Sequence, residues 1–297
     1  LHGRSAGLWS ALFAAAAPAL LNQRTDYLID FSLTAVLAAC WTLLSWRVLD
    51  GGRHPWRLSG ACGLALGAVL LTRPTGLLLL WLPLLALLIR AIRQLGRGHW
   101  QGLAQTALAA ALAWLVAGSW FSQNWLTILS TVNNARRWGV LYQEDLGPGT
   151  LAGWLFYPRV LPSMAGASLL GLVLAGWLLK CLRQRRWPRL PPSVSQRRRL
   201  AWWLSFPLGG LLLACLMSTK DVRFVLPFLP QLLLLLALLI SESGRWLQAA
   251  VLGLGLSGLL ACQFGIGLNV GYLDNDAELT RMERLLTAAS SRGGLLD

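Results

Sequence analysis

The chain has 297 residues, of which 56% are hydrophobic and 13% charged, and it carries a formal net charge of +14. A soluble domain has about 25% charged residues, so this composition excludes an ordinary soluble enzyme and indicates a membrane protein that crosses the bilayer several times. The positive charge would suit a nucleic-acid binder in a soluble protein. Here the basic residues lie between apolar segments, so we expect no nucleic-acid partner.

Nine apolar runs are predicted to cross the membrane, because about 17 to 20 mostly apolar residues are enough for one helical span. The runs cover residues 7–21, 27–49, 58–72, 76–92, 103–121, 165–182, 200–217, 224–240 and 246–263. A single helix over 58–92 would be about 50 Å long, so we expect two spans joined by a tight turn at Arg73-Pro74. The predicted fold class is an all-α polytopic membrane protein. Its transmembrane domain covers residues 1–263, and a polar non-cytoplasmic tail covers residues 264–297.

The distribution of Lys and Arg predicts the orientation of these spans. With the N-terminus in the cytoplasm, 16 of the 26 basic residues fall on the inner side and 7 on the outer side. Short loops that carry an excess of Lys and Arg stay in the cytoplasm. We therefore expect a multi-pass protein of the inner (plasma) membrane. Its basic connector, residues 184–199, is expected to contact anionic membrane lipids.

Four polar stretches fall on the outer side, at residues 22–30, 72–75, 124–145 and 218–223. Ionisable residues between or within membrane-spanning segments usually line a cavity, bind a ligand or take part in a reaction. Cationic side chains suit a phosphate or pyrophosphate, and carboxylates beside them suit general-base work or metal binding. This combination indicates an anionic lipid substrate that reacts with a polar acceptor on the non-cytoplasmic side.

Four strings in these regions carry a resemblance to a known family: QRTDYLIDFSLT (23–34), GLALGAVLLTRPT (63–75), SWFSQNW (119–125) and KDVRFVLPFLP (220–230). In this order they resemble elements of the C-type (GT-C) glycosyltransferases, in the branch with protein O-mannosyltransferases and aminoarabinose transferases. Ser32 and Ser119 stand where the family often has proline, and Phe224 replaces a tyrosine. None of these departures removes a charged group.

The resemblance implies a GT-C-like helical bundle that moves a sugar, with inversion, from a polyprenyl-phosphate carrier to a lipid, glycan or protein acceptor. The catalytic candidates are Asp30, Arg24 and Asp26. The substrate-binding candidates are Tyr27, Arg73, Asn124, Lys220, Asp221 and Arg223. In this hypothesis Arg24 orients the sugar or phosphate and Asp30 supports it or the acceptor. Three basic residues contact the carrier phosphate, namely Arg73, Lys220 and Arg223.

The residues themselves indicate no metal site, so no cofactor is expected, although a divalent metal stays open. Family members open with a transmembrane helix and an outer loop that holds the catalytic acid, and nothing before residue 7 supplies either. We therefore expect a fragment that begins about two helices in and ends early in the family's C-terminal region. Such a fragment can be inactive by itself.

Other interpretations of the same residues stay open. Asp26 and Asp30 could cap a helix, Arg73 could anchor a helix end at the interface, and residues 220–223 could form a surface ion-pair cluster. Three other functions are compatible with the composition: a flippase for a lipid-linked sugar, a non-catalytic lipid-binding scaffold, and a ligase or polymerase of surface glycans. The flippase would place ionisable groups in mid-helix and show an internal repeat, neither of which we find. The ligase or polymerase stays a possible function because such proteins usually have one large outer loop, and residues 122–164 are predicted to form one.

Overall fold

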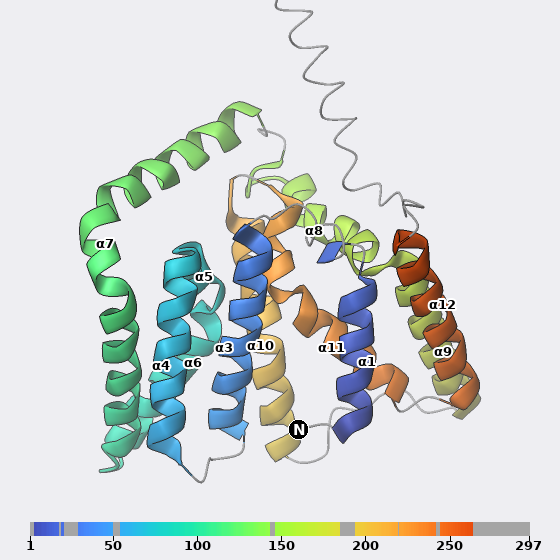
Figure 1. Cartoon of the computed structure of the whole chain (residues 1–297), viewed down its shortest axis with the longest axis horizontal. Helices are drawn as coiled ribbons and strands as arrows, with labels where there is room; N and C mark the ends of the chain where they lie inside the picture. Colours follow the sequence, from blue (N-terminus) through green and yellow to red (C-terminus); the bar gives the residue numbers. More distant parts are fainter. Residues whose placement is uncertain are drawn as a thin grey trace, which may run out of the picture.

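The computed structural model describes residues 3–17, 19–20, 29–49, 54–142, 146–184, 194–218, 220–241 and 244–263. Over these residues the protein is built from helices and turns, without strands (Figure 1). The prediction of an all-α fold is confirmed for this part of the chain. The helices are α1 Gly3–Ala16, α3 Ile29–Leu49, α4 Pro55–Thr72, α5 Thr75–Leu79, α6 Trp81–Leu95, α7 Gln101–Tyr142, α8 Leu151–Ala165, α9 Ala167–Gln184, α10 Val194–Leu216, the short 3₁₀ helices η2 Val222–Phe224 and η3 Leu226–Phe228, α11 Leu229–Ser241 and α12 Arg245–Gln263.

Most helices run alternately up and down between two ends of the bundle (Figure 1). We call the end at which α3 begins and α4 ends the upper end, and the end at which α3 ends and α10 begins the lower end. The chain turns at Arg73 and Pro74 and descends through α5 and α6, so the predicted break between residues 72 and 76 is confirmed. Each of the nine predicted runs overlaps a helix or a helix pair.

Four of the described helical segments are long and apolar enough to cross a membrane, namely Asp30–Leu49, Gln101–Asn134, Arg197–Leu216 and Val222–Ser241. A fifth span results if α8 and the first part of α9, which meet at 94°, are counted as one. The chain is therefore a membrane protein. That all nine runs cross the bilayer stays a prediction, because α1 and α6 have only 14 and 15 residues.

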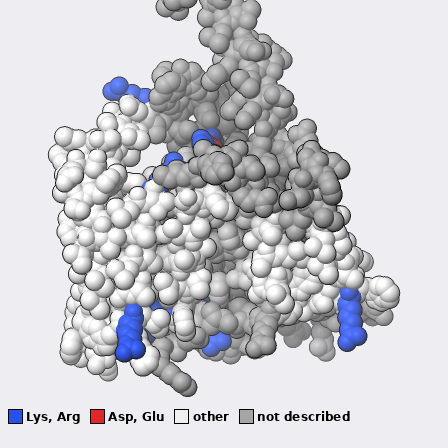
Figure 2. Space-filling model, viewed as in Figure 1, with Lys and Arg blue, Asp and Glu red and all other residues white. Residues whose placement is uncertain are grey.

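The surface of the bundle agrees with a lipid surrounding. α7 lies at one edge of the molecule (Figure 1), and its side chains of Trp114 and Leu115 are 66% and 76% exposed. In Figure 2, the described atoms across the middle of this face belong to uncharged residues, and Lys and Arg side chains lie above and below them. Large apolar side chains at such exposure indicate contact with lipid tails rather than with water.

Residues 122–164 were predicted as an outer loop, but the described part of this segment is largely helical, which corrects the prediction of a loop. α7 continues to Tyr142 because residues 122–142 contain no proline and a single glycine. α8 then lies across the upper end of the bundle (Figure 1). The chain leaves α8 through Gly166, whose φ of 93° is a conformation that favours glycine.

Thr150 caps the start of α8. Its backbone is extended, and its hydroxyl oxygen accepts a hydrogen bond of 3.1 Å from the backbone N–H of Gly153. We expect Thr150→Ala to lower the free energy of unfolding by about 1 kcal/mol, since an unfilled N-cap leaves a helix donor unpaired. Faster hydrogen exchange at the first amides of α8, compared with Thr150→Ser, is the measurement.

Aromatic packing joins α3 to α10 in the core. The rings of Trp41 and Trp202 stack with centroids 5.0 Å apart, and the ring of Phe206 lies 5.3 Å from Trp41. The indole N–H of Trp202 donates to the hydroxyl of Ser45 at 3.0 Å, which satisfies a polar group in the apolar interior. α4 and α7 pack through small residues instead. A Cβ atom at Gly63 would lie 2.5 Å from the carbonyl oxygen of Ala109.

Candidate functional site

The first polar feature of the upper end is an ion pair between Asp30 and Arg73. Asp30 lies in the first turn of α3, where a carboxylate also favours the helix dipole, and Arg73 directly follows α4 in extended backbone. One Arg73 guanidinium nitrogen donates to the Asp30 carboxylate. The side chain of Asp30 is 5% exposed, whereas that of Arg73 is 33% exposed. The carboxylate is therefore enclosed by the protein, and part of the guanidinium stays accessible.

Lys220 is the second feature, and it lies within the protein at 3% exposure. Its ammonium group donates to the carbonyl oxygens of Ala214 at 3.2 Å and Met217 at 2.7 Å, and also to that of Cys215. These acceptors belong to the end of α10 and the turn after it, where carbonyl groups lack helical partners. Burial lowers the pKa of Lys220, while the carbonyl oxygens favour its ammonium form. The geometry makes Lys220 a C-terminal cap of α10.

Asp221 and Arg223 lie next to this cap and are more accessible. The carboxylate of Asp221 accepts a hydrogen bond of 2.9 Å from the backbone N–H of Arg223 and one of 2.8 Å from its Nε. The side chain of Arg223 is 45% exposed, so this pair stabilises the fold by less than about 1 kcal/mol. Its guanidinium lies where a ligand at the upper end can reach it.

Tyr157 of α8 contacts the Lys220 segment (residues 220–223). Its hydroxyl oxygen accepts a hydrogen bond of 3.3 Å from the backbone N–H of Asp221, and its ring centroid lies 5.9 Å from the Lys220 ammonium. A cation at this distance from an aromatic ring is attracted to it. Tyr157 was not among the predicted site residues, because no spacing rule connects it with a segment so far along the chain.

The two features share one end of the bundle. α3 begins at the upper end, α10 ends there, and η3, which follows the Lys220 segment, packs against α3 (Figure 1). Three of the predicted site residues, Arg24, Asp26 and Tyr27, lie outside the described residues. Asp30, Arg73, Lys220, Asp221 and Arg223 are described, and all of them lie at the upper end.

Asn124 lies within α7 instead of at the end of a helix. Its amide nitrogen donates to the carbonyl oxygen of Trp120 at 2.9 Å, one turn earlier. The carbonyl oxygen of the side-chain amide is not used in that bond. A substrate contact by Asn124 therefore stays a prediction.

Among the described residues, no group of three or more His, Cys, Asp or Glu side chains could hold a metal ion. Comparisons with protein-family models, with curated proteins and with solved structures found no match to this chain.

Proposed function

We propose that the protein is a GT-C-type glycosyltransferase of the inner membrane that moves a sugar from a polyprenyl-phosphate carrier to an acceptor at the upper end of the bundle, which faces away from the cytoplasm. The ion pair between Asp30 and Arg73 carries the proposal. It joins the first two family-like strings, which are 43 residues apart at these positions, and it leaves the guanidinium accessible beside the membrane boundary.

In the proposed reaction, the acceptor hydroxyl oxygen forms a bond to the anomeric carbon of the sugar, and the bond from that carbon to the carrier phosphate oxygen breaks. The phosphate leaves with the electron pair, and the hydroxyl proton passes to a carboxylate at this end of the bundle. Arg73 and Arg223 bind the leaving phosphate, where positive charge stabilises the developing negative charge. Asp30 acts as a positioning residue for Arg73, because its carboxylate is enclosed and already paired.

Charge placement favours a transferase over a flippase. In α3, the ionisable residues are Asp30 in the first turn and Arg47 in the last turn. In α7, no ionisable residue precedes Arg136, and in α10 none follows Arg199. A transporter for an anionic lipid would keep ionisable groups near the middle of its spans. In these three spans the charged groups lie at the ends, where a reaction at the membrane boundary needs them.

The test assays membranes that contain the complete gene product for transfer from a radiolabelled polyprenyl-phosphate sugar. We expect Arg73→Gln to lower the rate by at least about tenfold, because a lost charge-assisted contact to phosphate costs about 1.5 to 3 kcal/mol. Asp30→Asn keeps the shape of the side chain but removes the charge that holds Arg73, and we expect a similar loss.

The matched control is Arg245→Gln, which removes an exposed basic residue at the lower end. Its transfer rate is expected to equal that of the unchanged protein at equal protein level. Full activity in both Asp30→Asn and Arg73→Gln would show that the ion pair stabilises the fold and takes no part in sugar transfer. Carrier-sugar movement across liposomes, without transfer to any acceptor, would favour the flippase instead.

A further inference from the structure

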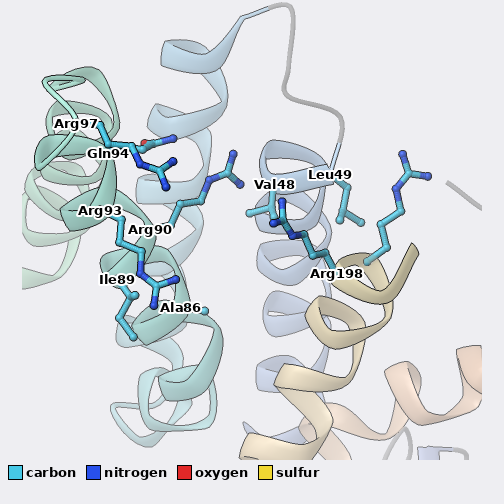
Figure 3. Close-up of a pocket in the computed structure, with 10 residues that line it drawn as sticks. Val48, Leu49, Ala86, Ile89, Arg90, Arg93, Gln94, Arg97 and Arg198 are labelled. Atoms are coloured by element: carbon cyan, nitrogen blue, oxygen red, sulfur yellow. The ribbon is translucent and has the colours of Figure 1, made fainter. Parts of the chain in front are cut away.

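A groove at the lower end is lined by arginines and lies apart from the upper end discussed above. It lies between α3, α6 and α10 and has a volume of about 800 Å³, within the range of about 300 to 1,000 Å³ that small-molecule sites occupy. We call it the basic groove, and its five arginines are Arg90, Arg93, Arg97, Arg198 and Arg199. Figure 3 shows Arg90 and Arg198 reaching into it from opposite sides.

The α6 wall of the basic groove changes from apolar to basic along the helix. Ala86 and Ile89 line its inner part, and Arg90, Arg93 and Arg97 follow towards the lower end (Figure 3). Arg90 and Arg93 are three residues apart, which puts them on one face of α6, and Arg97 lies in the turn that follows the helix. A lipid of the lower leaflet could therefore place an acyl chain next to Ile89 and its headgroup next to the arginines.

The positive charge in the basic groove lacks compensation from its own lining. None of the described residues that line it is acidic, and no ion pair among the described residues involves these five arginines. The nearest acidic residue in the sequence, Asp50, lies outside the described residues, and one carboxylate would leave most of this charge unbalanced. A second, smaller pocket extends the charged surface through Arg47 of α3. Clustered guanidinium groups that repel each other are stabilised by a bound anion.

We propose that the basic groove binds an anionic phospholipid of the surrounding bilayer, with its phosphodiester between the arginines of α6 and α10 and an acyl chain along Ala86 and Ile89. Arginine suits this ligand because its planar fork donates two parallel hydrogen bonds to phosphate oxygens. Basic pockets between transmembrane helices are a usual form of headgroup site. The bound lipid would hold α6 and α10 together at the lower end.

The test measures lipid binding to the purified full chain in detergent by native mass spectrometry. The probes are phosphatidylglycerol and phosphatidylcholine with the same acyl chains, so that they differ in headgroup charge alone. We expect saturable binding of phosphatidylglycerol in preference to phosphatidylcholine. We expect Arg93→Gln/Arg198→Gln to weaken phosphatidylglycerol binding about 25-fold, at about fivefold for each charge removed. We expect Arg93→Lys/Arg198→Lys to weaken it less, because lysine keeps the charge and loses the planar fork.

Arg57→Gln/Arg245→Gln is the matched control, because it removes the same charge from exposed residues outside the groove, on helices that begin at the lower end. It should bind phosphatidylglycerol as the unchanged protein does. An equal loss in this control would overturn the proposal, as would equal binding of the two lipids. Displacement of phosphatidylglycerol by millimolar inorganic phosphate would also overturn it, since the groove would then hold free phosphate without regard to the acyl chains.

Discussion

Gly63→Ala is expected to lower the free energy of unfolding by about 3 kcal/mol, the upper end of the usual cost of overpacking. A Cβ atom at Gly63 would lie 2.5 Å from the carbonyl oxygen and 2.8 Å from the Cα of Ala109. Both atoms belong to the backbone of α7, so no side-chain rotation relieves the contact. α4 and α7 would have to move apart, and the packing that holds α7 to the bundle would weaken.

Gly60→Ala, one turn earlier on the same face of α4, is the matched control. A Cβ atom there would meet the Cδ1 of Leu112 at 3.5 Å, an ordinary van der Waals distance. Alanine also favours the helix by about 0.5 to 1 kcal/mol over glycine, so this variant should be as stable as the unchanged protein or slightly more stable. Unfolding of the two variants in detergent with increasing SDS gives the comparison. Equal stability of both variants would show that the two helices do not pack as closely as described.

The α4 and α7 interface shows how far sequence alone reaches. Gly63 and Gly67 form a G-x-x-x-G pattern that is visible in the sequence and typical of close helix packing in membranes. The pattern does not name its partner helix, because any neighbour with small residues fits it. Ala109 and Ala113 of α7 become the partner only in the folded bundle. Hydropathy is a local property, and for that reason each of the nine predicted runs overlaps a helix, whereas α8 and the last turns of α7 lie in a segment that was predicted as a loop.

Two features of the site were not predicted, for different reasons. Lys220 was expected to contact a phosphate, whereas its ammonium group donates to carbonyl oxygens at the end of α10. A cation a few residues past a helix end is a known cap signal, so the sequence already contained this one. Tyr157 could not be predicted, because its contact with Asp221 depends on how α8 lies across the bundle. Arg90 and Arg93 lie one turn apart on α6, but their proximity to Arg198 depends on the packing of α6 against α10, which no local sequence pattern contains.

Lys220→Met is expected to lower the free energy of unfolding by roughly 1.5 to 3 kcal/mol, the usual value for hydrogen bonds made by a charged group. Methionine has a similar length and fills the space, but it donates no hydrogen bond to the carbonyl oxygens of Ala214, Cys215 and Met217. These oxygens would lose a donor in a part of the protein with little access to water. Thermal unfolding of the purified protein in detergent, followed by tryptophan fluorescence, measures the loss.

Comparing Arg223→Gln with Lys220→Met distinguishes a cation that binds the substrate phosphate from a cation that stabilises the fold. Arg223 lies three residues from Lys220, but its side chain is exposed and pairs with Asp221 at the surface, so its removal should change stability by less than about 1 kcal/mol. If Lys220 contacts the carrier phosphate instead of capping α10, Lys220→Met would leave thermal unfolding unchanged and raise KM for the carrier. If Lys220 caps α10, Lys220→Met lowers the stability, and only Arg223→Gln changes KM for the carrier. The reason is that a buried ammonium group held by the end of α10 is not available to a lipid phosphate.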